Sequence, residues 1–436
     1  MTSRQALRLT SRHRRLFELL ARRPVWTRWE LAQVTGWSAA TVWQLSRDLV
    51  NAGLVRVEGP GPSRGGRRPL LFSLAGDDEY LAVVRVGGAG RLELRWYNME
   101  GRRGAPSCDR VVVPAEAAEV QKGLVATLAH LVDAQRSTLP PPARVVGVAV
   151  ILPGLVDREG RLLFSSPLGL REVPVAAELG RLLHLPVVCG NDVDLAALGE
   201  SRWGGARAAR RLLYLWADQG IGLGMVFDGE LYLGSRSSAG ELGHFTVDPS
   251  GAPCRCGNRG CLGMTASEPG LVGQASRLVW VDQQTELRRL TGGDLNRVSL
   301  AQLAQAVAAG DHLAGQVVDQ ALDHLGLALA NLVNLLGPDL ILVAGSVFWM
   351  DPERVLHRLQ EAVDSHSLPF FREGVRLEPA PLGEEARFLG AVSLFREQLA
   401  GALWSALTAT GGKGEGGKEV GDEVVRVVRG DFFADQ

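Results

Sequence analysis

Three cysteines and one histidine stand close together in a segment that is rich in glycine and proline. The segment AGELGHFTVDPSGAPCRCGNRGCLG supplies His244, Cys254, Cys256 and Cys261. One imidazole and three thiolates complete the tetrahedral shell that zinc prefers, and a full shell of this kind is structural rather than catalytic. The alternative is three loop thiols beside an unrelated histidine, but the spacing Cys-x-Cys-x4-Cys has few uses in packing. We therefore predict a structural Zn²⁺ site.

The composition is that of a globular protein that works inside the cell. A chain of 436 residues is expected to form two or three domains. We find no apolar run that is long and uncharged enough to span a membrane, and no apolar stretch follows the basic N-terminus as in a secretory signal. We therefore expect a cytoplasmic protein with no membrane partner. Disulfides are not the default in that compartment, and the isolated Cys108 and Cys189 are predicted to be buried or inert thiols.

Positive charge is concentrated at the N-terminus. Up to Ala75 the chain has 13 arginines and 4 acidic residues, a net charge of +9, although the whole chain has a net charge of -1. A basic block on an acidic body predicts a polyanionic partner for the block alone. The alternative is a solubilising face without a partner, because charge in a sequence is only a weak indicator of binding.

The basic block has the element order of a winged helix-turn-helix. Thr27 and Glu30 form a capping-box pattern before the second helix, and Ser38 is placed to cap the third. The Gly-rich segment GPGPSRGGRRP cannot pack a core but suits a flexible wing. We expect helices over residues 11–22, 28–34 and 38–51, and strands over residues 54–58 and 70–74 on either side of the wing.

The third helix and the wing are predicted to contact DNA. A helix of this type fits the major groove, whose edges present a readable pattern of donors and acceptors. Arginines on a Gly-rich wing suit a narrow, negative minor groove. For Ser38 the alternative is a cap without a DNA contact, and for the whole module it is docking to a protein, which the arginines argue against. The predicted DNA-binding residues are Ser38, Thr41, Gln44, Arg47, Arg64, Arg67 and Arg68.

From about Tyr80 strands alternate with helices, which predicts an α/β body long enough for two lobes around a cleft. The expected strands cover residues 80–86, 92–97, 145–151, 187–188, 212–216, 224–227 and 340–343, the first two as a hairpin. The expected helices cover residues 115–135, most of 301–335, and 389–407. The tail over residues 411–436 is poor in apolar residues and is predicted to be disordered.

Four motifs of this body resemble those of the ROK family, which groups bacterial repressors and sugar kinases. They are GELGH followed by CRCGNRGCL, VVGVAVILPG at residues 145–154, CGNDVDLAALGE at residues 189–200, and LVNLLGPDLILVAG at residues 332–345. The resemblance covers about residues 80–407, and a winged helix with an SRGGRRP wing is what the repressor branch carries and the kinase branch lacks.

The resemblance implies an α/β fold in which an N-terminal winged helix precedes a two-lobed body like that of actin and hexokinase. The expected domains are a DNA-binding domain at residues 1–75 and a ROK domain at residues 80–407. Within the latter, lobe one would take about residues 80–190 and the C-terminal helix, and lobe two about residues 191–385.

The resemblance also implies a sugar site. Asn191, Asp192, Glu241 and His244 would face sugar hydroxyls, with His244 held from behind by zinc, and Asp192 would be the general base in a kinase. The alternative for these residues is a polar turn and a helix cap. Other positions depart from the family pattern, because Gly263 stands where a glutamate follows Cys-Leu, and the segment 165–172 lacks the usual asparagine and tryptophan. A sugar would lose roughly two hydrogen-bonding partners there.

The phosphate-handling motifs of the kinase branch are altered as well. Arg85 stands where family kinases have an acidic residue that organises magnesium, and an arginine cannot hold that ion. Asp218 begins DQGIG where kinases have Gly-Thr-Gly-Ile-Gly, and its charge would repel a phosphate. We therefore expect Asp192 to be a vestigial base and the protein to be no enzyme.

The expected function is a DNA-binding transcriptional regulator, most simply a repressor, of carbohydrate-related genes. The expected partners are a double-stranded DNA operator and a sugar effector, and a homodimer or homotetramer would place two heads on a palindromic operator. The alternative is a sugar kinase that phosphorylates a hexose or amino sugar with ATP. The sequence leaves open the operator, the effector, the sign of regulation and a phosphotransferase-system protein as the partner.

Overall fold

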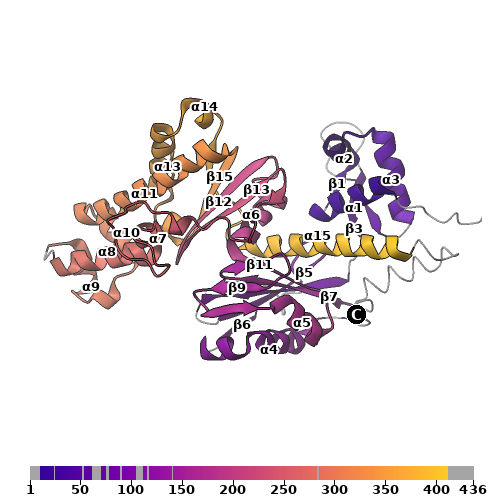
Figure 1. Ribbon diagram of the computed structural model, residues 1–436, viewed down its shortest axis with the longest axis horizontal. Coiled ribbons are helices and arrows are strands. Elements are labelled where there is room, and N and C mark those ends of the chain that lie inside the picture. Colours follow the sequence, from indigo (N-terminus) through magenta and orange to yellow (C-terminus); the bar gives the residue numbers. More distant parts are fainter. Residues whose placement is uncertain are drawn as a thin grey trace, which may run out of the picture. The chain divides into compact units, whose positions relative to one another are not determined.

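The computed structural model describes residues 10–23, 25–51, 54–60, 70–74, 78–88, 91–104, 111–114, 117–139, 141–281 and 284–410 (Figure 1). The chain divides into two compact units. Unit 1 takes the chain up to Leu195 and again from Arg387, and unit 2 takes Ala196 to Ala386. None of the helices in the described ranges is long and apolar enough to cross a membrane.

The N-terminal head, which is residues 10–74 of unit 1, has the predicted order of helices and wing strands. It contains α1 (Ser11–Arg22), α2 (Arg28–Thr35), α3 (Ala39–Asn51), β1 (Trp26–Thr27), β2 (Val55–Pro60) and β3 (Leu70–Leu74). The strands pair in the antiparallel order β1-β3-β2. The capping box is present, since Glu30 N donates to Thr27 Oγ1 at 3.1 Å and Thr27 N donates to Glu30 Oε2 at 2.8 Å. β1 was not predicted, because a strand of two residues is too short to show an alternating pattern.

The rest of unit 1, here called lobe one, is built on a five-stranded sheet in the order β11-β7-β4-β5-β6. Its strands are β4 (Glu79–Val86), β5 (Arg91–Asn98), β6 (Val111–Pro114), β7 (Arg144–Leu152) and β11 (Val187–Asn191). β4, β7 and β11 run parallel, while β5 and β6 are antiparallel to their neighbours. A small antiparallel sheet follows β7 and contains β8 (Leu155–Val156), β9 (Leu162–Ser165) and β10 (Leu170–Val173).

Helices cover both faces of the lobe-one sheet. α4 (Ala117–Arg136) and α5 (Val175–Leu183) bury apolar side chains against one face. α15 (Glu385–Thr410) lies on the other face, where a Cβ at Gly147 of β7 would meet the ring of Phe395. Figure 1 shows α15 between this sheet and the N-terminal head. The predicted final helix is therefore confirmed, and it is longer than expected at both ends.

Unit 2 contains a second five-stranded sheet in the order β14-β13-β12-β15-β16. The strands are β12 (Arg211–Ala217), β13 (Ile221–Phe227), β14 (Glu230–Leu231), β15 (Leu340–Ala344) and β16 (Arg376–Pro379), of which β12, β15 and β16 run parallel. α6 (Asp192–Arg202) begins in unit 1 and continues into unit 2. The predicted alternation of strands and helices is confirmed, so the chain has the α/β fold with an N-terminal winged helix.

Most of the remaining helices of unit 2 bury apolar side chains in one core with its sheet. The remaining helices are α7 (Gly263–Ala266), α8 (Glu268–Val281), α9 (Glu286–Thr291), α10 (Leu300–Ala308), α11 (His312–Leu336), α12 (Ser346–Met350), α13 (Pro352–His366) and α14 (Pro369–Arg372), with the short 3-10 helices η3 (Leu242–His244) and η4 (Leu295–Arg297). The helical region predicted over residues 301–335 is two helices, because Gly310 has a φ of +87° between α10 and α11.

Candidate functional site

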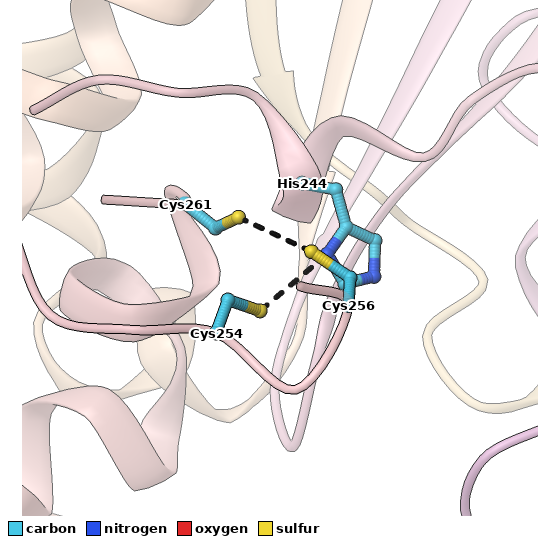
Figure 2. Close-up of side chains that lie close together, drawn as sticks. All are labelled: His244, Cys254, Cys256 and Cys261. Carbon is cyan, nitrogen blue, oxygen red and sulfur yellow. Dashed lines mark hydrogen bonds between the residues drawn. The ribbon is translucent and has the colours of Figure 1, made fainter. Parts of the chain in front are cut away.

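The predicted metal ligands converge at one place in unit 2. Figure 2 shows the side chains of His244, Cys254, Cys256 and Cys261 pointing toward a common centre. One ligand atom from each lies within 4.8 Å of all the others. Sγ of Cys254 is 3.7 Å from Nδ1 of His244, and Sγ of Cys256 is 3.6 Å from Sγ of Cys261. This group of sulfur and nitrogen donors could hold a metal ion.

The loop that carries the cysteines is shaped by its own backbone. Cys254 N donates to Asn258 O at 2.8 Å, and Val247 N donates to Gly260 O at 2.9 Å. Gly260 has a φ of +62°, and a Cβ there would lie 1.5 Å from the carbonyl oxygen of Asp248. Only glycine allows this approach, so the glycines of the motif are part of how the loop folds back on itself.

The thiols have different surroundings. Cys261 is fully buried, and this burial raises the pKa of its thiol to about 12. Cys256 is exposed, and a hydrogen bond from the backbone N–H of Asn258 lowers the pKa of its thiol. Because the thiolate is the form that binds metals, an ion entering this site has to displace the proton of Cys261.

His244 also faces a carboxylate. It ends η3, which packs on β13 so closely that a Cβ at Gly243 would lie 2.7 Å from Ile221 O. Nε2 of His244 is 4.0 Å from Oε2 of Glu241, and the two side chains are 48% and 49% exposed. His244 therefore turns Nδ1 toward the cysteines and Nε2 toward Glu241 and solvent.

Asn191 lies at the carboxyl end of β11 in unit 1 and caps α6. Its Oδ1 accepts hydrogen bonds from Val193 N at 2.8 Å and from Asp194 N at 3.1 Å, and its Nδ2 donates to Gly154 O at 2.8 Å. The helix-cap alternative is thus observed for Asn191. A contact with a ligand stays a prediction for this residue.

Asp192 is the first residue of α6, at the same edge of the sheet. Burial raises the pKa of its carboxyl group, and the positive charges of Arg387 and Arg85 oppose that rise. Ligands of α/β proteins bind beyond the carboxyl ends of parallel strands, and Asp192 directly follows the carboxyl end of β11. A contact between Asp192 and a ligand stays a prediction.

Arg85 and Asp218, the two residues predicted to disfavour phosphate binding, both have polar or charged partners in the structure. Arg85 of β4 pairs with Glu93 of β5 at 3.1 Å, and Glu93 also pairs with Arg95 at 2.7 Å. In unit 2, the hydroxyl of Ser346 lies 2.8 Å from Oδ1 of Asp218 and 2.7 Å from Oε2 of Glu268.

Asp218 and Ser346 follow the parallel neighbours β12 and β15, at the edge where α/β sheets bind phosphates. The carboxylates of Asp218 and Glu268, which both contact Ser346, oppose the approach of an anion to this edge.

The third helix of the head exposes part of the predicted DNA surface. Gln44 and Arg47 are exposed on α3, and Arg47 Nη2 donates to Gln44 Oε1 at 2.9 Å. Ser38 is exposed and caps the helix, since Thr41 N donates to Ser38 Oγ at 3.1 Å. Thr41 is half-buried. The predicted wing residues Arg64, Arg67 and Arg68 lie outside the described residues.

Sequence analysis missed one large side chain on this surface. Trp43 is 37% exposed and lies four residues before Arg47, so it shares the exposed face of α3. Its ring meets that of Phe72 of β3 edge to face, with the centroids 6.3 Å apart. Its spacing of four residues from Arg47 is the signal that could have identified it.

The remaining sequence landmarks have simple positions. Cys189 is buried in β11, as predicted, and Cys108 lies outside the described residues. Gly263 begins α7 and Leu170 begins β10.

Comparison with known proteins places these features in a family. The profile of the ROK family matches residues 104–398. The xylose repressor of Caldicellulosiruptor bescii is 26% identical over 375 residues, which cover 84% of this chain and 91% of that protein. A glucokinase of Halalkalibacterium halodurans is 32% identical over 256 residues, which cover 58% of this chain and 77% of that protein.

Among solved structures, a ROK family transcriptional regulator described as a homologue of the Escherichia coli MLC protein has a TM-score of 0.73. It is 22% identical and covers 96% of this chain and 98% of that chain, so the likeness supports the fold. A match over 84% of the chain is too long to fit within residues 78–436, and the match to the repressor therefore extends into the head.

Proposed function

Because the chain belongs to the ROK family, we propose that it is a sugar-responsive transcriptional repressor that binds operator DNA through its N-terminal head. The observation that carries this proposal is the winged helix joined to the ROK body, and the match to a repressor reaches into the head while the glucokinase match covers 58% of the chain. Residues 1–75 would be the DNA-binding domain and residues 80–407 the sensor.

The exposed face of α3 supports DNA as the partner. Gln44 and Arg47 can reach base edges or phosphates in a major groove, and the head has a net charge of +9 up to Ala75. A single winged helix reads a short site, so we propose a homodimer or homotetramer that places two heads on a palindromic operator. The wing residues Arg64, Arg67 and Arg68 would add minor-groove contacts.

We propose that the metal is zinc and that its role is structural. Tetrahedral zinc with bonds of roughly 2.3 Å to sulfur has ligand atoms about 3.8 Å apart. The distances of 3.6 Å between Cys256 and Cys261 and of 3.7 Å between Cys254 and His244 fit that shell. Four protein ligands leave no open position for a substrate, so zinc would brace the loop and fix the ring of His244.

We propose that the effector is a sugar and that Asn191, Asp192, Glu241 and His244 recognise its hydroxyls. If Nδ1 of His244 binds the metal, its Nε2 carries the proton and can donate to a hydroxyl, while Glu241 beside it can accept. The carboxylate of Asp192 can accept a second hydroxyl proton. Asn191 and Asp192 belong to unit 1, and Glu241 and His244 belong to unit 2.

Operator binding in the presence of sugars tests this function. Fluorescence anisotropy on a palindromic operator would be titrated with D-xylose, D-glucose and N-acetylglucosamine in turn. We expect one sugar class to weaken operator binding by about 5- to 150-fold, the usual range of allosteric coupling. The Glu241→Gln variant should need more of that sugar for the same effect. An operator affinity that no sugar changes would rule out the induction step.

A sugar kinase is the second candidate because the glucokinase is 32% identical over its match. Arg85 cannot hold magnesium, and Asp218 with Glu268 places negative charge where a nucleotide phosphate would bind. We expect no sugar-dependent consumption of ATP with common hexoses and amino sugars in a coupled assay. Turnover that disappears in the Asp192→Asn variant would establish the kinase instead.

A further inference from the structure

One buried arginine of α15 joins the N-terminal head to lobe one. Arg396 is 1% exposed, and its guanidinium donates hydrogen bonds to four main-chain carbonyls. Nε donates to Ala21 O at 2.9 Å, and Nη2 donates to Leu20 O at 3.1 Å and to Arg23 O at 2.8 Å. Nη1 donates to the carbonyl of Met99, in the turn after β5. A single side chain thus holds the head and lobe one at once.

Two of these carbonyls, those of Leu20 and Ala21, belong to the last turn of α1, and that of Arg23 follows the helix directly. The last carbonyls of a helix have no partner within it and carry partial negative charge. The planar guanidinium of Arg396 offers five N–H donors in a fixed fork, which suits several carbonyls in one plane. Burial lowers the pKa of Arg396 to about 10, so the side chain remains charged at neutral pH. The contact therefore joins a positive charge to the negative end of α1.

The same face of α15 continues into the head. Ala400 and Trp404 follow Arg396 at intervals of four residues, and both are buried in the apolar core of the head. A second link lies beside it, where Arg56 of β2 pairs with the buried carboxylate of Glu100 in lobe one. Figure 1 shows the C-terminal half of α15 running along the head.

The N-terminal half of α15 lies against the helix that begins at Asp192. A Cβ at Gly390 would lie 1.7 Å from Leu195 O of α6, so the two backbones are in direct contact. Phe388 packs under the guanidinium of Arg95, with 3.8 Å between the carbon of that group and the ring centroid. α15 therefore contacts α6 near one end and α1 toward the other.

We propose that Arg396 is a positioning residue of the regulator, which fixes the head to α15 so that the helix in contact with α6 sets the orientation of the DNA-binding surface. The proposal rests on the proposed function only in taking DNA as the partner of the head. In a dimer, heads held in this way would be presented to the two half-sites already oriented. Without the clamp, each head would have to be ordered when DNA binds, at a cost in affinity.

The orientation of the head can be measured without DNA. Spin labels on p-acetylphenylalanine at the exposed positions Gln33 of α2 and Asp133 of α4 avoid the native cysteines and report the distance from head to lobe one in the full-length chain. Pulsed EPR should give one narrow distribution with Arg396 in place. We expect Arg396→Met to broaden it about twofold or more, because the head is then held by fewer contacts. Gln398→Met, on the exposed side of α15, is the matched control and should leave the width unchanged.

The Arg396→Lys variant keeps the test decisive if Arg396→Met does not fold. Lysine retains the charge but has three donors on one nitrogen, so it cannot bond four spread carbonyls. We expect a broadening between those of the control and the methionine variant. A folded Arg396→Met or Arg396→Lys chain with the narrow distribution of the control would overturn the proposal.

Operator binding provides a readout that general damage to the head would not give. On a palindrome selected from random duplexes, Arg396→Met should bind about tenfold or more weaker, while its affinity for one half-site should change by less than about twofold. Equal weakening on both DNAs would overturn the proposal, because it would mean that the DNA-binding surface itself is damaged. If the unaltered chain bound no DNA, the proposed function would fail, and the EPR comparison would still decide the role of Arg396.

Discussion

Replacing Cys256 with serine is expected to release the metal ion from the chain. Cys256 is the exposed thiol of the cluster, so the substitution removes one ligand without opening a cavity in the core. Metal content should fall from about one ion per chain to near zero, because a hydroxyl is a poor substitute for a thiolate in a structural zinc shell. Elemental analysis of the purified protein measures this directly.

The loss of metal should also destabilise the loop. Structural zinc contributes about 10–16 kcal/mol of apparent binding free energy in small zinc domains, and that energy supports folding. We expect faster amide exchange over residues 244–262, where backbone hydrogen bonds such as Val247 to Gly260 and Cys254 to Asn258 join residues of the same segment. Cys189→Ala, which removes a buried thiol outside the cluster, is the control and should leave the metal content unchanged. Full metal content in the Cys256→Ser protein would refute the site.

Removal of the head is expected to abolish operator binding. A chain that begins at Asp78 lacks α3 and the basic block, so it has neither the helix predicted to read bases nor the net charge of +9 of the N-terminal residues. Gel shift on the selected palindrome should show no complex at concentrations that saturate the full chain. A retained shift would mean that another part of the chain binds DNA.

The truncation also exposes Arg396 and Trp404, which are buried under the head. A variant of the full-length chain is therefore needed as a second test. A Gln44→Ala/Arg47→Ala double variant keeps every contact of α15 and removes two exposed side chains of α3. Each base contact of this kind contributes about 1–3 kcal/mol, so we expect the specific affinity to fall at least about tenfold. Substitution of the exposed Gln33 on α2 by alanine is the control.

The features that could be predicted from the sequence are those whose residues lie close together in the chain. The four residues of the metal cluster fall within one short segment, and the glycines that fold the loop stand between them. The capping box of α2 and the cap of α3 join residues three apart. Local spacing was therefore enough to predict the helices of the head and to bring the cluster together.

Most features that could not be predicted from the sequence join residues that are far apart in the chain. Arg396 bonds to the carbonyls of Leu20, Ala21, Arg23 and Met99, and the chain contains no periodicity that signals such a contact. The grouping of Asp218, Glu268 and Ser346 depends on the parallel pairing of β12 and β15. Trp43 is an exception, because its position on the exposed face of α3 follows from local spacing.

Genome-wide mapping of the DNA bound by the full-length chain in its own cells tests the central claim most directly. The account predicts a small set of discrete sites that share one palindromic sequence, lie near carbohydrate-related genes, and are lost in the Gln44→Ala/Arg47→Ala variant. Binding with no enriched sequence, or sites that persist unchanged in that variant, would contradict it.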